Sequence, residues 1–402
     1  MRTKAAVLLK QPGEWEVADV GLDPPRQGEL LVRMGAAGLC HSDDHIATGD
    51  LPTTSLPMAG GHEGAGIVAE VGPETPGWAP GDKVVLSFLP MCGLCKWCAS
   101  GMQNLCDNGA GVLMGTRPDG SRRMRLDGLP VSQAAGVSTF SELSTVSVQS
   151  AVKIADDIPL DIACLTSCGV STGWGSAVNS AQVRPGQVVI VVGVGGIGMN
   201  AVQGATHAGA SVIIAVDPVP MKRDASFRFG ATHAAATIDE AADLARSLTN
   251  GQGADSCIVC VGLTTGEHIA KGVAAIRKAG TCVMTGLGRF ADDGSIPVSV
   301  REVVLYQKRL QGSLFGASSP SRDIPAMLDL YRQGRLKLDE LITTRYTLGD
   351  VNQGYQDMRD GRNIRGVIVF DLPVLHMTDM IQNTSMLRHR PRFPAAFTVE
   401  SR

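Results

Sequence analysis

The chain has 402 residues and a formal net charge of -3, with 44% hydrophobic and 19% charged residues. This length suggests two domains, and the near-neutral charge gives no reason to expect nucleic acid or a membrane surface as a partner. No apolar stretch is long enough for a signal-peptide core or a membrane span, so the ten cysteines are expected to be thiols and metal ligands in a cytoplasmic protein.

The segment from residue 1 to about 170 contains short apolar runs separated by Gly- and Pro-rich turns. The runs are 5–9, 29–33, 66–71 and 83–86. Short strands joined by many turns predict an irregular, mainly β domain.

The composition changes at about residue 184. Residues 187–192 form a continuous β-branched run, which is typical of a strand buried on both faces. Further strands are expected at 212–216, 257–261 and 281–285, alternating with helices at 197–208, 219–229, 239–248 and 266–278. This alternation predicts an α/β fold with a doubly wound parallel sheet. After about residue 312, helices at 323–333 and 350–360 and a strand at 366–370 are expected to return to the first domain.

A glycine-rich turn follows the first strand of the predicted sheet and opens a helix. Its residues are Gly193, Gly195, Gly196, Ile197 and Gly198, in the pattern G-x-G-x-x-G. In this context Gly193 allows a tight turn, Gly195 lets the backbone approach a pyrophosphate, and Gly198 lets the helix pack closely on the strand. The alternative is a purely structural turn.

Asp217 closes the next strand, where a carboxylate can accept a hydrogen bond from the adenosine ribose 2′-OH. Because a carboxylate repels a 2′-phosphate, NAD is favoured over NADP. Lys222 and Arg223 either touch the same ribose or form a solvated helix start.

Four cysteines lie in one short segment with the spacing C-x2-C-x2-C-x7-C: Cys92, Cys95, Cys98 and Cys106. Such a set can close a four-thiolate zinc site that orders its loop. An iron–sulfur cluster is the alternative, since C-x2-C-x2-C also begins ferredoxin runs. The seven-residue spacing, the lack of a proline after Cys106 and the lack of a second set favour zinc.

Cys40, His62 and Cys168 can supply three ligands to a second zinc that keeps one position open. Sequence spacing alone does not bring them together. Cys164, four residues before Cys168, could equally be the ligand, or it could be a small buried hydrophobe.

Several ordered motifs identify a family resemblance. They are residues 38–43, 61–66, 81–84 and 168–169, with the four-cysteine segment and the glycine turn. Over residues 1 to about 370 the chain resembles the zinc-dependent medium-chain alcohol dehydrogenases. The resemblance implies a GroES-like, mainly β catalytic domain at 1–170, a Rossmann NAD-binding domain at 171–312, a return to the catalytic domain at 313–370, and a tail of unknown role at 371–402.

The resemblance also assigns residues to the metal site. It implies that Cys40, His62 and Cys168 bind a catalytic zinc, that Glu63 lies beside it, and that Asp43 orients His62. A zinc in such a site lowers the pKa of an alcohol hydroxyl, and the alcohol then passes hydride to NAD. Ser42 and His45 match the positions that carry the proton away.

Other implied positions contact the cofactor or the substrate. His41 and Arg365 match positions that face the pyrophosphate, and Thr172 matches one near the nicotinamide. Phe88 and Trp174 are expected to line the substrate pocket.

One branch of the family fits best. Residues 230–233, 312–316, 346–348, 351–358 and 361–367 resemble the actinobacterial alcohol dehydrogenases assayed with a nitrosoaniline dye. Members of that branch retain NAD through turnover and pass electrons to another acceptor, such as the redox peptide mycofactocin. The substrate implied is a primary alcohol, oxidised to its aldehyde.

Three alternatives remain open beside this branch. An ordinary dehydrogenase with exchangeable NAD and a thiol-adduct formaldehyde dehydrogenase belong to the same class, although residues 107–111 lack the basic residue that glutathione-dependent members use. A non-enzymatic nucleotide-binding protein is disfavoured by the retained metal ligands. The long loop between Cys106 and Phe140 resembles that of the dimeric rather than the shorter-looped tetrameric relatives, which implies a homodimer. The apolar run at 310–316 is expected to pair across its two-fold axis as an edge strand.

Overall fold

The structure is a computed structural model that describes residues 1–117, 119–288 and 295–372, without the side chains of residues 110 and 112–114. Contacts group Met1–Phe370 as one compact unit. From residue 373 onward, the tail expected at 371–402 lies outside the described residues.

The second half of the chain contains a six-stranded parallel sheet with the order β13-β12-β11-β14-β15-β16. Its strands are β11 (Val188–Val192), β12 (Val212–Val216), β13 (His233–Ala235), β14 (Ala254–Val259), β15 (Ile276–Met284) and β16 (Arg309–Gly312). Numbered from its own first strand, this order is 3-2-1-4-5-6, the order of a Rossmann fold. The sheet predicted from the alternating pattern is therefore confirmed.

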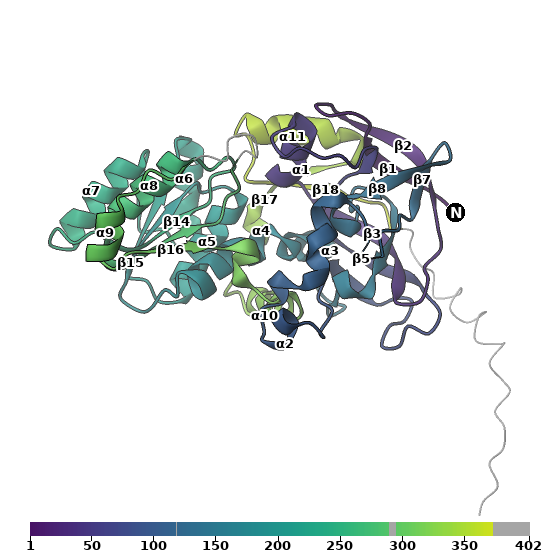
Figure 1. The fold of residues 1–402 in the computed structure, drawn as a ribbon, viewed down its shortest axis with the longest axis horizontal. Helices are drawn as coiled ribbons and strands as arrows, with labels where there is room; N and C mark the ends of the chain where they lie inside the picture. The colour runs from purple at the N-terminus through teal and green to yellow at the C-terminus, as the bar shows by residue number, and fades with distance from the viewer. Residues whose placement is uncertain (118, 289–294, 373–402) are drawn as a thin grey trace, which may run out of the picture. The chain divides into compact units, whose positions relative to one another are not determined.

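Helices cover both faces of this sheet (Figure 1). On β11, Val189 and Val191 pack in one core cluster with residues of α5, whereas Ile190 and Val192 pack in another with residues of α7 and α8. Alternate side chains of a strand point to opposite faces, so a strand covered on both sides must be apolar throughout. The helices are α5 (Gly196–His207), α6 (Pro220–Ser226), α7 (Ile238–Leu248), α8 (Gly266–Ala275) and α9 (Val300–Leu305).

The first half of the chain is mainly β, as predicted. A closed barrel has the order β1-β2-β7-β8-β4, and a seven-stranded sheet has the order β10-β6-β5-β3-β18-β17, with β9 paired to β3. The barrel strands are β1 (Arg2–Leu8), β2 (Trp15–Leu22), β4 (Met58–Ala59), β7 (Met124–Leu126) and β8 (Leu129–Gln133). The sheet strands are β3 (Glu29–Gly38), β5 (Glu63–Val71), β6 (Lys83–Leu86), β9 (Leu143–Ser147), β10 (Ala151–Lys153), β17 (Ile342–Tyr346) and β18 (Arg365–Val369).

The chain returns to this sheet after the parallel sheet is complete. Strand β18 pairs antiparallel with β3, with Val367 opposite Gly38. The remaining helices are α1 (His41–Thr48), α2 (Lys96–Ala99), α3 (Leu160–Ala163), α4 (Gly169–Gly175), α10 (Pro320–Arg332) and α11 (Val351–Arg359). The last two agree with the helices expected at 323–333 and 350–360.

Sequence reasoning missed β13. This strand has only three residues, and His233 and Ala234 are half-buried, so it carries no apolar run that would mark it. It pairs with β12 through Ala234 opposite Ala215. Tertiary packing rather than local propensity places it in the sheet.

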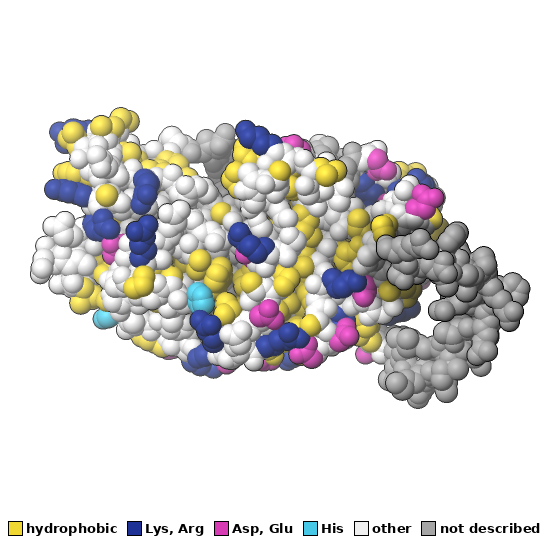
Figure 2. Space-filling view, turned by 90° about the horizontal axis from the view of Figure 1, so that it is seen from below, with side chains coloured by type: hydrophobic (Ala, Val, Ile, Leu, Met, Phe, Trp, Pro, Cys, Tyr) yellow, Lys and Arg dark blue, Asp and Glu magenta, His cyan; other side chains and the backbone are white. Residues whose placement is uncertain are grey.

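Charged side chains of both signs occur on the face drawn in Figure 2, where Asp and Glu lie beside Lys and Arg in its lower half. This mixture agrees with the formal net charge of -3. Among the described residues no helix is both long and apolar enough to cross a membrane.

Candidate active site

A cleft of about 1350 Å³ runs between α1 and the carboxyl edge of the parallel sheet, and most of the candidate residues for the catalytic zinc and for NAD line it. Ligands of doubly wound sheets bind outside the carboxyl ends of the strands, at the point where the strand order reverses. Here that point lies between β11 and β14, and both Gly193 and Cys260 border the cleft there.

The glycine turn has the geometry that a bound pyrophosphate needs. Gly193 has a φ of +82°, which a residue with a Cβ rarely adopts. A Cβ at Gly198 would lie 1.9 Å from the carbonyl oxygen of Gly193, so only glycine lets α5 pack against the turn. A Cβ at Gly195 would meet nothing within 4 Å, because this residue faces open space at the start of α5. The free N–H groups of the helix start can therefore reach an anion.

Asp217 lies at the end of β12 beside this turn. Its Oδ2 accepts from the Val194 N–H (3.1 Å) and its Oδ1 from the Val219 N–H (2.9 Å). The carboxylate thus ties the glycine turn to the next strand while bordering the cleft. Lys222 lines the cleft as well, whereas Arg223 donates to the backbone carbonyl of Asp217 (2.7 Å) and supports the turn.

The structure brings Cys40, His62, Glu63 and Cys168 together, with one ligand atom of each within 4.8 Å of the others. Cys40 directly precedes α1 and Cys168 directly precedes α4, while His62 and Glu63 lie at the start of β5. All four side chains are buried. Two thiolates and an imidazole are a donor set that zinc prefers.

Cys164 is not part of this cluster. Its Sγ donates to the backbone carbonyl of Asp161 (3.2 Å) from a fully buried position. Burial raises the pKa of this thiol well above its ordinary value. Between the two cysteines that sequence reasoning left open, the structure therefore groups Cys168 with Cys40 and His62.

The carboxylate of Asp43 fixes the orientation of the His62 ring. Its Nδ1 lies 2.8 Å from Asp43 Oδ2, so its Nε2 is the nitrogen left to bind a metal. Burial alone would lower the pKa of His62, but Asp43 and Cys40 together raise it to about 10. A hydrogen bond from Cys168 lowers the pKa of Cys40 well below its ordinary value, and the same contact raises that of Cys168. The surroundings of Cys40 thus favour its thiolate, which is the form that binds a metal.

Glu63 and Arg365 connect this cluster to the glycine turn. The fully buried Glu63 accepts from the Gly169 N–H (3.2 Å) and pairs with Arg365. A Cβ at Gly196 would lie 3.3 Å from Arg365 Nε, and this buried Nε has no hydrogen-bond partner among the described residues. A guanidinium with a free buried N–H beside the glycine turn fits a pyrophosphate oxygen.

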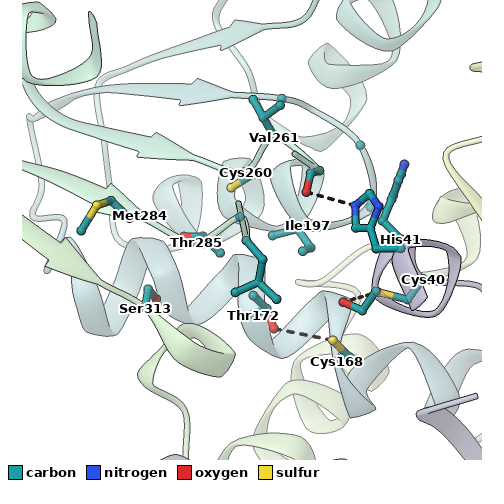
Figure 3. A pocket seen from close by; sticks show the side chains of 18 of the residues that line it. Cys40, His41, Cys168, Thr172, Ile197, Cys260, Val261, Met284, Thr285 and Ser313 are labelled. Carbon is teal, nitrogen blue, oxygen red and sulfur yellow. Dashed lines mark hydrogen bonds between the residues drawn. The ribbon is translucent and has the colours of Figure 1, made fainter. Parts of the chain in front are cut away.

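The expected proton-relay residues also border the cleft. Ser42 Oγ lies 3.9 Å from Cys40 Sγ, and His45 Nε2 lies 3.2 Å from the carbonyl oxygen of Gly262. The rings of His41 and His45 are 5.9 Å apart, and Thr172 Oγ1 lies 4.0 Å from Cys168 Sγ (Figure 3). All of these residues line the same cleft.

One aromatic prediction is correct and one is wrong. Phe88 lines the cleft, with its ring edge-on to His62 at 5.5 Å. Trp174 is not among the lining residues and packs instead on His207, with the rings 5.5 Å apart. Because Trp174 lies two residues after Thr172 on α4, it points about 200° away from the side that faces the cleft.

The four-cysteine segment forms a separate cluster, in which the Sγ atoms of Cys92, Cys95, Cys98 and Cys106 lie within 4.8 Å of one another. Backbone N–H groups of the same loop point at the sulfurs: Cys95 N–H donates to Cys92 Sγ (3.3 Å) and Cys98 N–H to Cys95 Sγ (3.5 Å). Such bonds lower the pKa of Cys95 to about 6. Four thiol groups leave no open position, so this cluster suits a structural metal.

Sequence reasoning missed three residues at the carboxyl edge of the sheet. Cys260, Thr285 and Ser313 follow the ends of β14, β15 and β16 and line the cleft. One signal could have found them: in a parallel sheet, residues near the carboxyl ends of neighbouring strands meet at the ligand edge.

Comparisons with known proteins agree with this geometry. Residues 26–156 match the alcohol dehydrogenase GroES-like domain, and residues 196–333 match the zinc-binding dehydrogenase domain. The chain is 48% identical over 369 residues to the NDMA-dependent alcohol dehydrogenase of Amycolatopsis methanolica, across 92% of this chain and 99% of that protein. The chain belongs to the zinc-dependent alcohol dehydrogenase family.

Two further relatives extend the comparison. Alcohol dehydrogenase B of Mycobacterium tuberculosis (strain ATCC 25618 / H37Rv) is 46% identical over 369 residues, across 92% of this chain and 98% of that protein. The crystal structure of benzyl alcohol dehydrogenase from Acinetobacter calcoaceticus superimposes with a TM-score of 0.85 at 28% identity, covering 92% of this chain and all of that one. The predicted fold class, family and enzyme class are confirmed.

As a member of this family the protein is an oxidoreductase that acts on alcohols, with zinc and NAD as its cofactors. Two cysteines and one histidine with an open position form a known zinc-ligand set of alcohol dehydrogenases. The Cys40, His62 and Cys168 cluster has the same composition.

Proposed function

We propose that this alcohol dehydrogenase oxidises primary alcohols to aldehydes, that its NAD stays bound through turnover, and that an external redox carrier reoxidises it. The observation that carries the reaction is the cluster of Cys40, His62, Glu63 and Cys168 inside the cleft that the glycine turn also borders. Identity of 48% to an NDMA-dependent relative supports the choice of branch.

Each cofactor has its own set of residues in this proposal. Cys40, His62 and Cys168 hold the catalytic zinc, and Cys92, Cys95, Cys98 and Cys106 hold the structural one. NAD is held by the glycine turn, by Asp217 and Lys222 at the ribose, by His41 and Arg365 at the pyrophosphate, and by Thr172 near the nicotinamide. Residues 1–170 and 313–370 are assigned to the catalytic domain and residues 171–312 to the NAD domain.

Zinc supplies a Lewis acid that makes an alcohol hydroxyl more acidic, and NAD supplies the hydride acceptor. The residues of the chain then handle the proton. The Ser42 hydroxyl lies two residues from a metal ligand and 3.9 Å from its sulfur, so it is the first group that can accept the alcohol proton. His45 lines the same cleft, with its Nε2 3.2 Å from the carbonyl oxygen of Gly262, and is the next group of the proposed relay.

The relay assignment is tested by Ser42→Ala. Loss of a positioned proton acceptor lowers turnover by about 100-fold or more, with both zinc ions retained. Zinc content and single-turnover rates measure this directly. A variant with full zinc and unchanged turnover would contradict the relay.

The acceptor is tested by oxidation of a short primary alcohol in two parallel assays. One contains added NAD and no dye, and the other contains a nitrosoaniline dye and no added NAD. Turnover with the dye alone, together with stoichiometric NAD released by acid from the purified protein, supports a retained cofactor. Turnover that requires added NAD would identify the alternative, an ordinary NAD-exchanging alcohol dehydrogenase.

We also infer a homodimer that forms at the edge of the parallel sheet. Strand β16 is one of the two edge strands of this sheet, and α9, which precedes it in the chain, exposes Val300 (77%), Val304 (65%) and Leu305 (68%). Exposed apolar side chains beside a free strand edge favour pairing with a second copy. Light scattering after gel filtration measures the mass; a single tetrameric mass would contradict this inference. None of the ten cysteines forms a disulfide, which supports the proposed cytoplasmic location.

A further inference from the structure

A carboxylate outside the cleft faces one of the candidate relay residues. His45 lines the cleft, and its Nδ1 lies 3.5 Å from Asp50 Oδ2. Among the described residues that line the cleft, Asp50 is not included, and its side chain is 19% exposed against 9% for His45. The imidazole therefore stands between the buried site and a carboxylate that reaches water.

The end of α1 places Asp50 beside His45. Gly49 ends the helix with a φ of +92°, and the N–H groups of Gly49 and Leu51 both donate to the carbonyl oxygen of His45 (3.1 and 2.9 Å). Asp50 lies between these two donors. Thr48 Oγ1 donates to Asp50 Oδ2 (2.9 Å), which is the oxygen that faces the ring. The tight turn and this hydroxyl together hold the carboxylate in position.

Both ring nitrogens of His45 face hydrogen-bond acceptors. Nε2 lies 3.2 Å from the carbonyl oxygen of Gly262, which can only accept, while Nδ1 faces the carboxylate of Asp50. A neutral imidazole has one N–H and satisfies only one of these acceptors, whereas an imidazolium donates to both. The surroundings thus suit the protonated ring, which is the form that His45 takes once it has received a proton.

His41 and Asp44 also lie near this ring, but neither replaces Asp50. The ring of His41 is 5.9 Å from that of His45 and lines the cleft, so it does not lead outward. Asp44 attracts His45 electrostatically, but its carboxylate pairs with Arg359 of α11. Asp50 is therefore the carboxylate that is placed to act on the Nδ1 side of His45.

We propose that Asp50 is a positioning residue for alcohol oxidation, which orients His45, stabilises the imidazolium that forms when His45 takes the alcohol proton, and directs that proton to water. This inference rests on the proposed function, in which Ser42 and His45 receive the proton. The step needs no further reactant: each alcohol gives one proton to the relay and one hydride to NAD. The ring becomes neutral again when the proton on Nδ1, beside Asp50, passes to water.

The experiment follows NADH absorbance during a single turnover of the zinc-loaded protein with a short primary alcohol. Asp50→Asn keeps the size of the side chain and removes its charge. We expect it to slow hydride transfer about tenfold, which is part of the roughly 100-fold that a positioned proton acceptor supplies. The alcohol concentration at half-maximal rate should stay within about twofold of the wild type, because Asp50 does not line the cleft. Asp50→Glu restores the carboxylate and should regain most of the rate.

A second background shows whether Asp50 acts through His45. His45→Gln is expected to slow the same step, and Asp50→Asn added to it should change the rate by less than about twofold, because the group that Asp50 supports is gone. Asp44→Asn is the matched control: it removes a neighbouring charge that is paired elsewhere, so its rate should stay within about twofold of the wild type.

Zinc content is measured for every variant, so that a loss of structure is not taken for a loss of the proton route. If Asp50→Asn loses zinc, Thr48→Val replaces it, since this variant removes the hydroxyl that orients Asp50 and keeps the charge; a step about threefold slower would support the proposal, and an unchanged rate would overturn it.

Additive losses in the double variant, an unchanged rate in Asp50→Asn, or an equal loss in Asp44→Asn would overturn the role of Asp50 and leave the proposed function intact. A wild-type rate in His45→Gln would instead contradict the relay of the proposed function, and this inference with it.

Discussion

The two metal-ligand clusters of this chain are built in different ways. The four thiols of the structural cluster come from one segment, Cys92 to Cys106, and are held largely by backbone N–H groups of their own loop. The catalytic cluster takes Cys40, His62 and Cys168 from distant parts of the chain. Its supports are side chains from several elements, among them Asp43 behind His62 and Arg365 beside Glu63.

The difference separates two requirements. A structural site needs only a closed loop, which local spacing can supply. A catalytic site needs an open position next to both cofactor and substrate, so its ligands must come from the elements that border the cleft. Side chains that hydrogen-bond to the ligands also set the orientation and basicity of those ligands. Each such side chain is therefore a position at which one substitution weakens the site.

The largest expected effect comes from Cys168→Ser. Replacing a thiolate in the catalytic cluster removes the catalytic zinc, and turnover falls by about 1000-fold or more because the Lewis acid is lost. Zinc content falls from two ions per chain to one. The matched control is Cys164→Ser, which changes a buried cysteine outside the cluster and is expected to keep both ions and most of the activity. Equal losses in both variants would contradict the assignment of Cys168.

The same contrast explains what could be predicted from sequence. The structural cluster follows from its spacing, and the parallel sheet follows from the β-branched run at β11 and the alternating pattern after it. Cys40, His62 and Cys168 have no local pattern that joins them, so only resemblance to a family brought them together. Their grouping depends on the pairing of β3 with β5 and on the packing of α4, which are non-local.

Thr285 and Ser313 show the limit more clearly. Single hydroxyl residues occur throughout the chain, and nothing in the local sequence marks these two. They meet Ser176 only because β15 and β16 end side by side against the helical turn that follows α4. Trp174 shows the opposite error, since an aromatic residue near a ligand was placed in the pocket without regard to helical direction.

A smaller effect is expected from Asp43→Asn, which tests the side-chain support of the catalytic cluster. The neutral amide of asparagine forms a weaker hydrogen bond to His62 Nδ1–H than the aspartate carboxylate does. The affinity for the catalytic zinc is therefore expected to fall by about 10- to 100-fold. Competition with a chelator, followed by zinc analysis, measures this. Asp44→Asn is the neighbouring control, because Asp44 pairs with Arg359 rather than His62. Equal zinc loss in both variants would mean that α1 as a whole, and not the Asp43 contact, holds the ligand.

The smallest effect on turnover is expected from Cys98→Ser in the structural cluster. Loss of that zinc frees the segment from Cys92 to Cys106, which contains the 90% exposed Leu94, so protease cleavage there should accelerate. The thermal midpoint should fall by roughly 5 °C. The loop also supplies Met102 and Leu105 to the cleft, so KM should rise about threefold while kcat stays within about twofold of the wild type. A kcat loss as large as that of Cys168→Ser would show that the two clusters are not separate in function, because a loop that only shapes the cleft affects binding before it affects chemistry.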